Sequence, residues 1–433
     1  MKHTDIIQKL NLEQKCALLS GETVFTTRAL PGKGIPAITL SDGPNGVRKQ
    51  AGAADHLGLN PSVPATCFPT SSATACSWDE KLGEAVGEAL GEEAAAQEVA
   101  VLLGPGLNIQ RSPLCGRDFE YFSEDPILAG RMAAAYVRGI QKNGISACPK
   151  HFAVNSQELR RMASDSVLDE RTLRELYLTG FEIVVKEAKP KTIMTSYNLI
   201  NGTYANENAH LLQDILRKDW GFDGAVVTDW GGSNDHALGV KNGSTLEMPC
   251  PGGDSIRELM KAVQDGKISE ADVDARLDEM LELVLSTHAA VEKAPRTFDA
   301  AAHHKLARRA AAESIVLLRN EGGILPLKPN EKLAVIGDFA ETPRYQGAGS
   351  SAVNALQVDT LLDSIKADDS GITFVGYASG FERQGAADAE KLEEAVALAK
   401  KADTVLLCLG LDELRESEGL DRADMKLAEN QQQ

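Results

Sequence analysis

The sequence predicts an α/β protein in which a TIM-like (β/α)-barrel is followed by a partial α/β sandwich domain. Apolar strand-like segments alternate with helical segments from residue 35 to about 250, which implies a parallel sheet. Several of these strands end on charged or aromatic side chains, and barrels place catalytic groups at the C-terminal ends of different strands. A second strand and helix pattern begins at Leu333. A doubly wound open sheet is the competing architecture, and it would concentrate the site at one switch point.

The clearest strand is the apolar segment 224–228, which is followed by Asp229, Trp230 and two glycines. A buried parallel strand that presents a carboxylate at its C-terminal end is where α/β proteins place chemistry. Asp229 is therefore a candidate nucleophile. An Asp in this position also commonly caps a turn or helix, and the motif alone does not decide between the two.

The remaining elements of the barrel follow from the apolar periodicity. A loop over residues 43–77 separates the first strand from a helix that is expected to begin at Ser77, with Glu80 completing a capping box. A long helix after Ser269 precedes an irregular stretch over 286–304. The other expected strands are 35–40, 99–103, 145–148, 192–195 and a short one near Thr245, and the other helices are 126–142, 169–188 and 209–218.

Beyond the irregular stretch, strands are expected at 333–337, 373–377 and 404–409, with a helix at 392–400. The predicted domains are a catalytic barrel over 1–290, a linker over 291–315 and the second domain over 316–433. This second sheet is small and has little to cover its edges, which suggests that the chain stops inside a domain.

Composition narrows the functional classes. The 433 residues carry 45 basic and 63 acidic side chains, and the net charge of −18 argues against nucleic acid or an anionic membrane as a partner. No segment has the apolar length of a membrane span, and the first twelve residues lack the core of a signal peptide. The seven scattered cysteines fit neither a disulfide framework nor a zinc site. We expect a cytoplasmic protein without metal or cofactor, and a homo-oligomer is left open.

Several polar motifs occur in a fixed order along the chain. They lie at 41–48, 103–113, 116–120, 123–126, 150–152, 196–198 and 227–230, and read SDGPNGVR, LGPGLNIQRSP, GRDFE, SEDP, KHF, SYN and VTDW. Together they resemble glycoside hydrolase family 3 of the β-glucosidase type over residues 10 to about 430. The resemblance implies a retaining exo-β-glycosidase, in which one carboxylate attacks the anomeric carbon and another carboxyl group serves as acid and base.

By this resemblance Asp229 is the nucleophile, and Asp42 binds the distal hydroxyls of the sugar. The other implied sugar-contacting positions are Arg111, Lys150, His151, Arg161, Met194, Tyr197 and Trp230. Each also has a structural interpretation: a lone arginine is more often an ion pair, and Met194 is more often core. We favour a functional role for Asp42, Lys150, His151 and Asp229 above the rest.

The acid/base is implied to come from the second domain, where residues 418–422 read EGLDR. This points to Glu418, with Glu416 as the alternative, although an acidic run is commonly only a solvated loop. The loop 347–351 is not a phosphate loop, because it lacks the Gly-Lys-Ser/Thr ending, and Ser350 and Ser351 are weak sugar-contact candidates. Residues 153–158 lack the histidine loop of the N-acetylglucosaminidase branch, which disfavours amino sugars.

The expected function is therefore hydrolysis of terminal β-D-glucosyl residues from small β-glucosides. Two alternatives stay open on the sequence. One is a barrel lyase that forms a Schiff base on Lys150. The other is a non-catalytic sugar-binding protein, which an incomplete second domain would produce.

Overall fold

The computed structural model describes residues 1–52 and 60–433, and its first domain is built on short parallel strands. Two parallel sheets, β1-β2-β3 and β5-β8, supply the inner wall. Isolated pairings join these strands and neighbouring segments: Phe152 with Thr195, Val227 with Leu246, and Ser20 with Glu247. The Leu40 amide, at the start of β1, donates a hydrogen bond to the Phe25 carbonyl at 2.8 Å. Because Ser20 in the same N-terminal segment pairs with Glu247, this bond closes the ring of strands. The strands are β1 (Leu40–Asp42), β2 (Val101–Leu103), β3 (Ser146–Ala147), β5 (Thr192–Met194) and β8 (Ala225–Val227). The expected (β/α)-barrel is confirmed.

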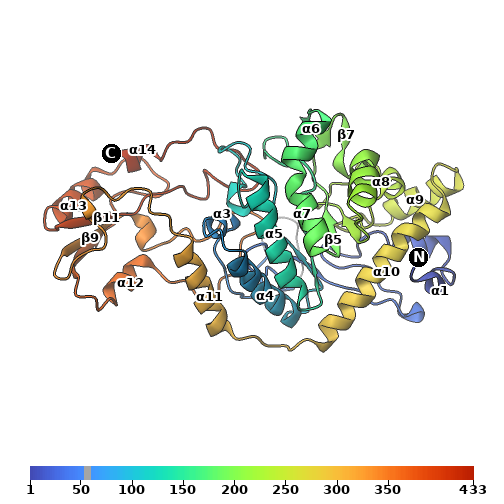
Figure 1. Ribbon diagram of the computed structural model, residues 1–433, viewed down its shortest axis with the longest axis horizontal. Coiled ribbons are helices and arrows are strands. Elements are labelled where there is room, and N and C mark those ends of the chain that lie inside the picture. The colour runs from blue at the N-terminus through green and yellow to red at the C-terminus, as the bar shows by residue number, and fades with distance from the viewer. Residues whose placement is uncertain (53–59) are drawn as a thin grey trace.

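Helices pack around this ring, and the chain then continues to a second domain at the opposite end of the molecule (Figure 1). Within the described ranges, every helix is too short or too polar to traverse a lipid bilayer. A small sheet of β4 (Asp165–Ser166), β6 (Leu199–Ile200) and β7 (Thr203–Tyr204) lies outside the ring. The helices are α1 (Thr4–Ile7), α2 (Leu12–Ala17), α3 (Ser71–Ala75), α4 (Glu80–Ala96), α5 (Pro126–Gln141), α6 (Glu170–Thr172), α7 (Thr179–Ala188), α8 (His236–Asn242), α9 (Asp254–Gln264) and α10 (Glu270–Lys293), with π-helical turns at Leu173–Tyr177 and His210–Asp219.

Three local expectations need correction. The helix expected from Ser77 begins at Glu80 instead, because Trp78 has a φ of 56° and Asp79 accepts hydrogen bonds from the amides of the first turn. The expected loop over 43–77 contains α3, and its residues 53–59 lie outside the described part of the chain. The expected irregular stretch over 286–304 is helical up to residue 293 and again from residue 300, where α11 (Ala300–Glu313) begins.

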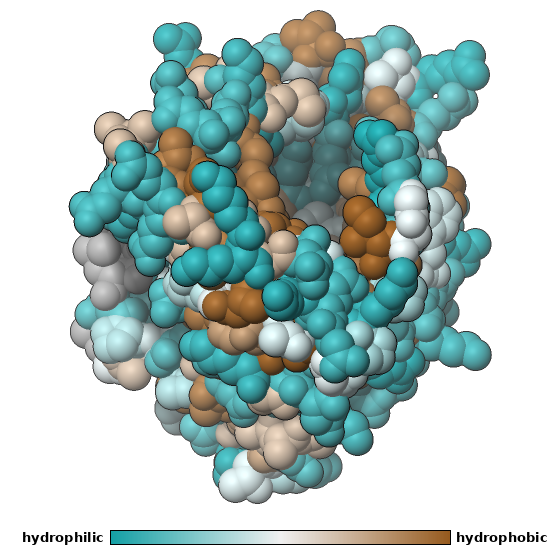
Figure 2. Space-filling view, turned by 90° about the vertical axis from the view of Figure 1, so that its left-hand side faces the viewer, coloured by the Kyte–Doolittle hydropathy of each residue, from teal (hydrophilic) through white to brown (hydrophobic). Residues whose placement is uncertain are grey.

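The second domain holds a parallel sheet in the order β10-β9-β11, formed by β9 (Lys332–Ile336), β10 (Thr373–Ala378) and β11 (Thr404–Leu407). Its helices are α12 (Leu361–Lys366), α13 (Ala389–Ala399) and α14 (Glu429–Gln432). Its buried cluster consists of Ile336, Ala378 and Ala395, whereas Leu407 on β11 is 56 % exposed. Figure 2 views this end of the molecule and shows hydrophobic side chains on its surface among hydrophilic ones. The sheet is as small and open as the sequence suggests.

Helix α11 connects the two domains and is fastened to the barrel by a buried ion pair. His303 Nδ1 lies 2.7 Å from Glu93 Oε1 on α4, and the other Glu93 oxygen accepts a hydrogen bond from the Thr66 amide at 2.9 Å. Burial by itself would lower the pKa of His303, but Glu93 and Glu92 raise it. The protonated imidazolium therefore stabilises the fold at low pH, and this contribution disappears as the pH rises through the raised pKa.

We expect Glu93→Ala to lower the free energy of unfolding by about 3 kcal/mol at pH 6, because it leaves His303 and the Thr66 amide buried without their partner. Glu92→Ala is the matched control: the Glu92 carboxylate also contacts His303, at 3.3 Å, but its side chain is 45 % exposed, so a loss below about 1 kcal/mol is expected. Urea unfolding of both variants at pH 6 and pH 8 checks this. Equal losses would contradict the role of Glu93.

Candidate active site

Four predicted residues meet at the C-terminal ends of the barrel strands. Asp42 ends β1, Lys150 and His151 follow β3, and Asp229 follows β8. Lys150 Nζ lies 4.0 Å from Asp42 Oδ1, and His151 Nε2 lies 3.6 Å from Asp229 Oδ2. The Asp42 and Asp229 side chains are 15 % and 12 % exposed.

Asp229 has one oxygen held and one oxygen free to react. Its Oδ1 accepts a hydrogen bond from the Trp230 amide at 2.8 Å, whereas Oδ2 is buried and has no hydrogen-bond partner among the described residues. Burial raises the pKa of Asp229, and the positive charges of Arg117, Arg161 and Lys150 act in the opposite direction. These cations favour the ionised form that a nucleophile needs.

His151 contributes polarity rather than charge. Burial, together with Arg117, Lys150 and Arg161, lowers the pKa of His151 well below its ordinary value, so the imidazole is neutral near pH 7. Its Nδ1 lies 3.1 Å from the Tyr121 hydroxyl. The positive charge near Asp229 is therefore supplied by Arg117, Arg161 and Lys150.

Asp42 is the second buried carboxyl group at the strand ends. Burial raises the pKa of Asp42 to about 6, although Lys150 and Arg48 lower it. The charge of Asp229 is among the influences that raise the pKa of Asp42, which places the two carboxylates in one electrostatic neighbourhood. Asp42 is thus ionised at neutral pH and becomes protonated in mild acid.

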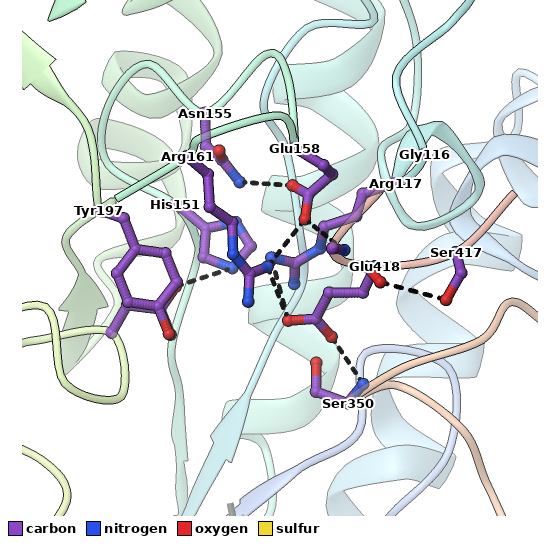
Figure 3. A network of polar contacts seen from close by, with 12 residues as sticks. Gly116, Arg117, His151, Asn155, Glu158, Arg161, Tyr197, Ser350, Ser417 and Glu418 are labelled. Carbon is purple, nitrogen blue, oxygen red and sulfur yellow. Dashed lines mark hydrogen bonds and ion pairs between the residues drawn. The ribbon is translucent and has the colours of Figure 1, made fainter. Parts of the chain in front are cut away.

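The site contains an arginine that the sequence interpretation missed. Arg117 is almost fully buried, pairs with Glu120 through its Nε, and has NH1 3.7 Å from Glu418 Oε1. Together with Arg161 it forms the network drawn in Figure 3. The available signal was the GRDFE segment at 116–120, where an arginine precedes a glutamate by three residues. Such i,i+3 pairs meet on a helical turn.

Arg111, by contrast, is not among the largest influences on the pKa of Asp229. It lines a cavity of about 500 Å³, and none of the other residues predicted for the site lines it with Arg111. The two arginines differ by six positions in one loop, and the structure brings Arg117 to the strand ends instead.

The remaining predicted residues, Met194, Tyr197 and Trp230, differ in where their side chains lie. Met194 is 1 % exposed and belongs to the barrel core, as its alternative interpretation expected. The Tyr197 hydroxyl donates to the Trp230 carbonyl at 2.9 Å, and the Arg161 guanidinium lies 4.9 Å from the centre of the Tyr197 ring. Trp230 is fixed by a hydrogen bond from its indole nitrogen to the Val24 carbonyl at 2.8 Å.

Glu418 reaches this site from the second domain, as Figure 3 shows. Its Oε1 accepts a hydrogen bond from Arg161 at 2.8 Å, and its Oε2 accepts one from the Ser350 amide at 2.7 Å. Burial alone would raise the pKa of Glu418, but Arg117, Arg161 and the Ser350 contacts hold it well below the usual range. Glu418 is among the charges that act on Asp229, which places the two carboxylates near each other.

Glu416, the alternative acid/base, pairs with a different arginine from Glu418. Its Oε2 pairs with Arg344 at 2.9 Å, and it lines a cavity of about 620 Å³ between α3, α11 and the second domain. Glu418, and not Glu416, is among the largest influences on the pKa of Asp229. Ser350 meets Glu418 through its backbone amide, and Ser351 is buried.

The site is built from carboxylates, arginines and single lysine and histidine side chains. In the part of the chain that the structure describes, no cluster of three or more His, Cys, Asp or Glu side chains is arranged to hold a metal ion. The chemistry that these groups themselves offer is nucleophilic attack by a carboxylate and proton transfer by another.

The chain has relatives among known proteins. Residues 53–283 match the glycosyl hydrolase family 3 N-terminal domain, and residues 315–433 match the C-terminal domain of the same family. Over 98 % of the chain, thermostable beta-glucosidase B of Acetivibrio thermocellus is 45 % identical, and an exo-alpha-(1->6)-L-arabinopyranosidase of Bifidobacterium longum is 44 % identical. The chain spans 56 % and 57 % of the length of these two relatives.

Solved structures give the same result for the fold. A beta-glucosidase of Bifidobacterium adolescentis superimposes with a TM-score of 0.91 at 42 % identity, covering 98 % of this chain and 60 % of its own. Beta-glucosidase 3B of Thermotoga neapolitana in complex with glucose gives a TM-score of 0.86 at 34 % identity, covering 98 % of this chain and 64 % of its own. The chain therefore belongs to glycosyl hydrolase family 3.

Proposed function

We propose that this protein is a retaining exo-β-glycosidase that hydrolyses terminal non-reducing β-D-glucosyl residues of small β-glucosides. One observation carries the proposal: Asp229 at the end of β8 and Glu418 from the second domain are two carboxylates influenced by the same pair of arginines, Arg117 and Arg161. Retaining glycosidases need two carboxyl groups in separate roles, one as nucleophile and one as acid and base.

The reaction proceeds in two displacements. Asp229 Oδ2 attacks the anomeric carbon, the bond from that carbon to the leaving oxygen breaks, and Glu418 gives its proton to that oxygen. Glu418, now ionised, takes a proton from a water molecule, whose oxygen attacks the same carbon and releases Asp229. The product keeps the configuration of the substrate, because the anomeric carbon is inverted twice.

Arg117 and Arg161 favour the form of Glu418 that the second displacement needs over the form that the first needs. Arg161 and Arg117 favour ionised Glu418, which is the form required to activate water. Proton donation requires the Arg161–Glu418 contact to loosen. Glu158 offers the alternative partner, because its Oε2 also lies 2.8 Å from Arg161 NH1. We infer that the first step depends strongly on the leaving group.

The sugar-binding end is assigned to Asp42, Lys150 and His151, which offer an acceptor, a cation and a neutral ring. Such a set binds hydroxyl groups without requiring charge on the ligand. Arg161, Tyr197 and Trp230 are assigned to the surroundings of the nucleophile, and Met194 to the wall behind them. Sugar binding by Arg111 stays a prediction. Glucose is supported by the names of the beta-glucosidase relatives, whereas the relative named as an arabinopyranosidase shows that the sugar varies within the family.

A mechanism-based trap tests the proposal. A 2-deoxy-2-fluoro-glucoside with a good leaving group should add one fluoroglucosyl unit to the peptide that contains Asp229. A nitrophenyl glycoside panel should then rank glucose against xylose and arabinose. Borohydride trapping of a carbonyl substrate on Lys150 would indicate the lyase instead, and glucose binding without nitrophenol release would indicate a non-catalytic protein.

Glucose binding should depend on pH through Asp42. Because the pKa of Asp42 is about 6, its ionised fraction falls about tenfold per pH unit below that value. Calorimetric titration with glucose from pH 8 to pH 5 should therefore show weaker binding in acid. Asp42→Asn should bind weakly at every pH. A binding constant that stays level down to pH 5 in the parent would contradict the role of ionised Asp42.

The predicted division into 1–290, 291–315 and 316–433 stays a proposal, which the change of sheet between β8 and β9 supports. A small β-glucoside is the proposed partner. The cytoplasmic location stays a prediction, and a homo-oligomer stays open.

A further inference from the structure

The loop that carries Glu418 is held on the barrel by the carboxylate of Asp421. Asp421 Oδ1 accepts from the Gly116 amide at 3.1 Å and from the Glu158 amide at 2.9 Å, and Oδ2 accepts from the Leu159 amide at 2.9 Å. Gly116 lies in the loop after β2, and Glu158 and Leu159 lie in the loop after β3. One side chain of the second domain thus binds two separate loops of the barrel.

The backbone around Asp421 strengthens this attachment. The Gly419 amide donates to Glu158 Oε2 at 2.8 Å, and the Arg422 amide donates to the Leu114 carbonyl at 2.7 Å. Gly116 leaves no space for a side chain, because a Cβ there would lie 1.7 Å from the Leu420 carbonyl oxygen. The loop therefore sits on the barrel by close backbone contact on both sides of Asp421.

Glu158 connects this attachment to the chemistry. Its amide is bound by Asp421, and its carboxylate is bound by both the Gly419 amide and Arg161. Arg161 in turn binds Glu418 Oε1. Moving Asp421 would therefore displace the carboxylate of Glu418 and also the carboxylate that orients its arginine partner.

We propose that Asp421 is a positioning residue for proton transfer by Glu418, an inference that rests on the proposed function. Asp421 is assigned no contact with the sugar. Hydrogen bonds from neutral amides to an ionised carboxylate are stronger than neutral ones, and three of them define the place of the loop. A carboxyl group that transfers protons must lie within hydrogen-bond reach of the leaving oxygen, so a displaced loop loses this function first.

Leaving-group dependence tests the role. Asp421→Ala should reduce kcat/KM on phenyl glucoside by about 100-fold, within the range that general acid–base catalysis contributes, and on 2,4-dinitrophenyl glucoside by less than about 5-fold. Asp421→Asn, which keeps one acceptor oxygen, should give an intermediate loss. Asp424→Ala is the matched control, because Asp424 lies in the same loop and, among the described residues, binds only the nearby Lys426 amide, so it should retain the parent rates on both substrates.

The outcomes separate the inference from the proposed function. Equal losses on both substrates in Asp421→Asn, with an unchanged thermal unfolding midpoint, would overturn the positioning role and leave the proposed function standing. Parent rates for Asp421→Ala would also overturn it. A parent protein that hydrolyses neither glucoside would overturn both together. A selective loss on phenyl glucoside, with parent-like unfolding of Asp421→Asn, would support the role.

Discussion

Asp229→Ala is expected to abolish turnover of aryl glucosides, with kcat reduced by at least about 10⁴-fold, a magnitude typical of removing a catalytic nucleophile. The unpartnered Oδ2 is the atom that would form the glycosyl bond, and no other carboxylate of the site lies at the end of β8. The fold should persist, because the close hydrogen bond that the Asp229 side chain accepts comes from the adjacent Trp230 amide and so joins no distant segments. Stopped assays with nitrophenyl glucoside, beside circular dichroism, provide the measurement.

The matched control for this variant is Asp223→Ala, just before the same strand. Its side chain is 90 % exposed and lies 4.0 Å from Lys2, so we expect the parent rate within about twofold. Asp229→Asn, which keeps the shape of the side chain, should be as inactive as Asp229→Ala. Turnover by Asp229→Ala at the parent rate would reject Asp229 as nucleophile.

Glu418→Ala should give a different pattern, in which the loss depends on the leaving group. We expect kcat/KM on phenyl glucoside to fall by about 10³-fold, because its leaving oxygen needs a proton, whereas 2,4-dinitrophenyl glucoside needs none in the first step. Glu418→Gln should behave alike while retaining a partner for the Ser350 amide. Comparing the two variants separates an effect on catalysis from an effect on stability, since Glu418→Ala leaves the buried Arg117 with one partner fewer.

Glu416→Ala is the control that decides between the two acids. Glu416 pairs with Arg344 and not with the arginines near Asp229, so its removal should affect both substrates equally and slightly. Should Glu416→Ala instead show the selective loss on phenyl glucoside, the acid/base role would pass to Glu416.

The sequence predicts the site residues at the strand ends better than it predicts the arginines of the site. Asp42, Lys150 and Asp229 could be found because each follows a short apolar strand, and the ends of parallel strands converge at one edge. The arginines lie in long loops, where no periodicity fixes the direction of a side chain. The glutamate three positions after Arg117 is the one local signal that distinguishes it from Arg111, and the folded loop brings Arg117 next to that Glu120.

The protonation states of the site residues were harder to predict from the sequence than their positions. The neutral state of His151 depends on its complete burial beside other cations. The low pKa of Glu418 likewise depends on two arginines from the other domain. The predicted helix start at Ser77 was wrong for a more local reason. The left-handed backbone conformation of Trp78 interrupts the turn before Asp79.

The contact between the acid loop and the barrel uses main-chain groups at most of its points. The amides of Gly116, Glu158 and Leu159 and the carbonyl of Leu114 all take part. Main-chain groups are the same in every residue except proline, so most side chains here are free to diverge without weakening the contact. A second domain grafted from a distant homologue should therefore still dock, provided that it brings its own aspartate three positions after the proton donor.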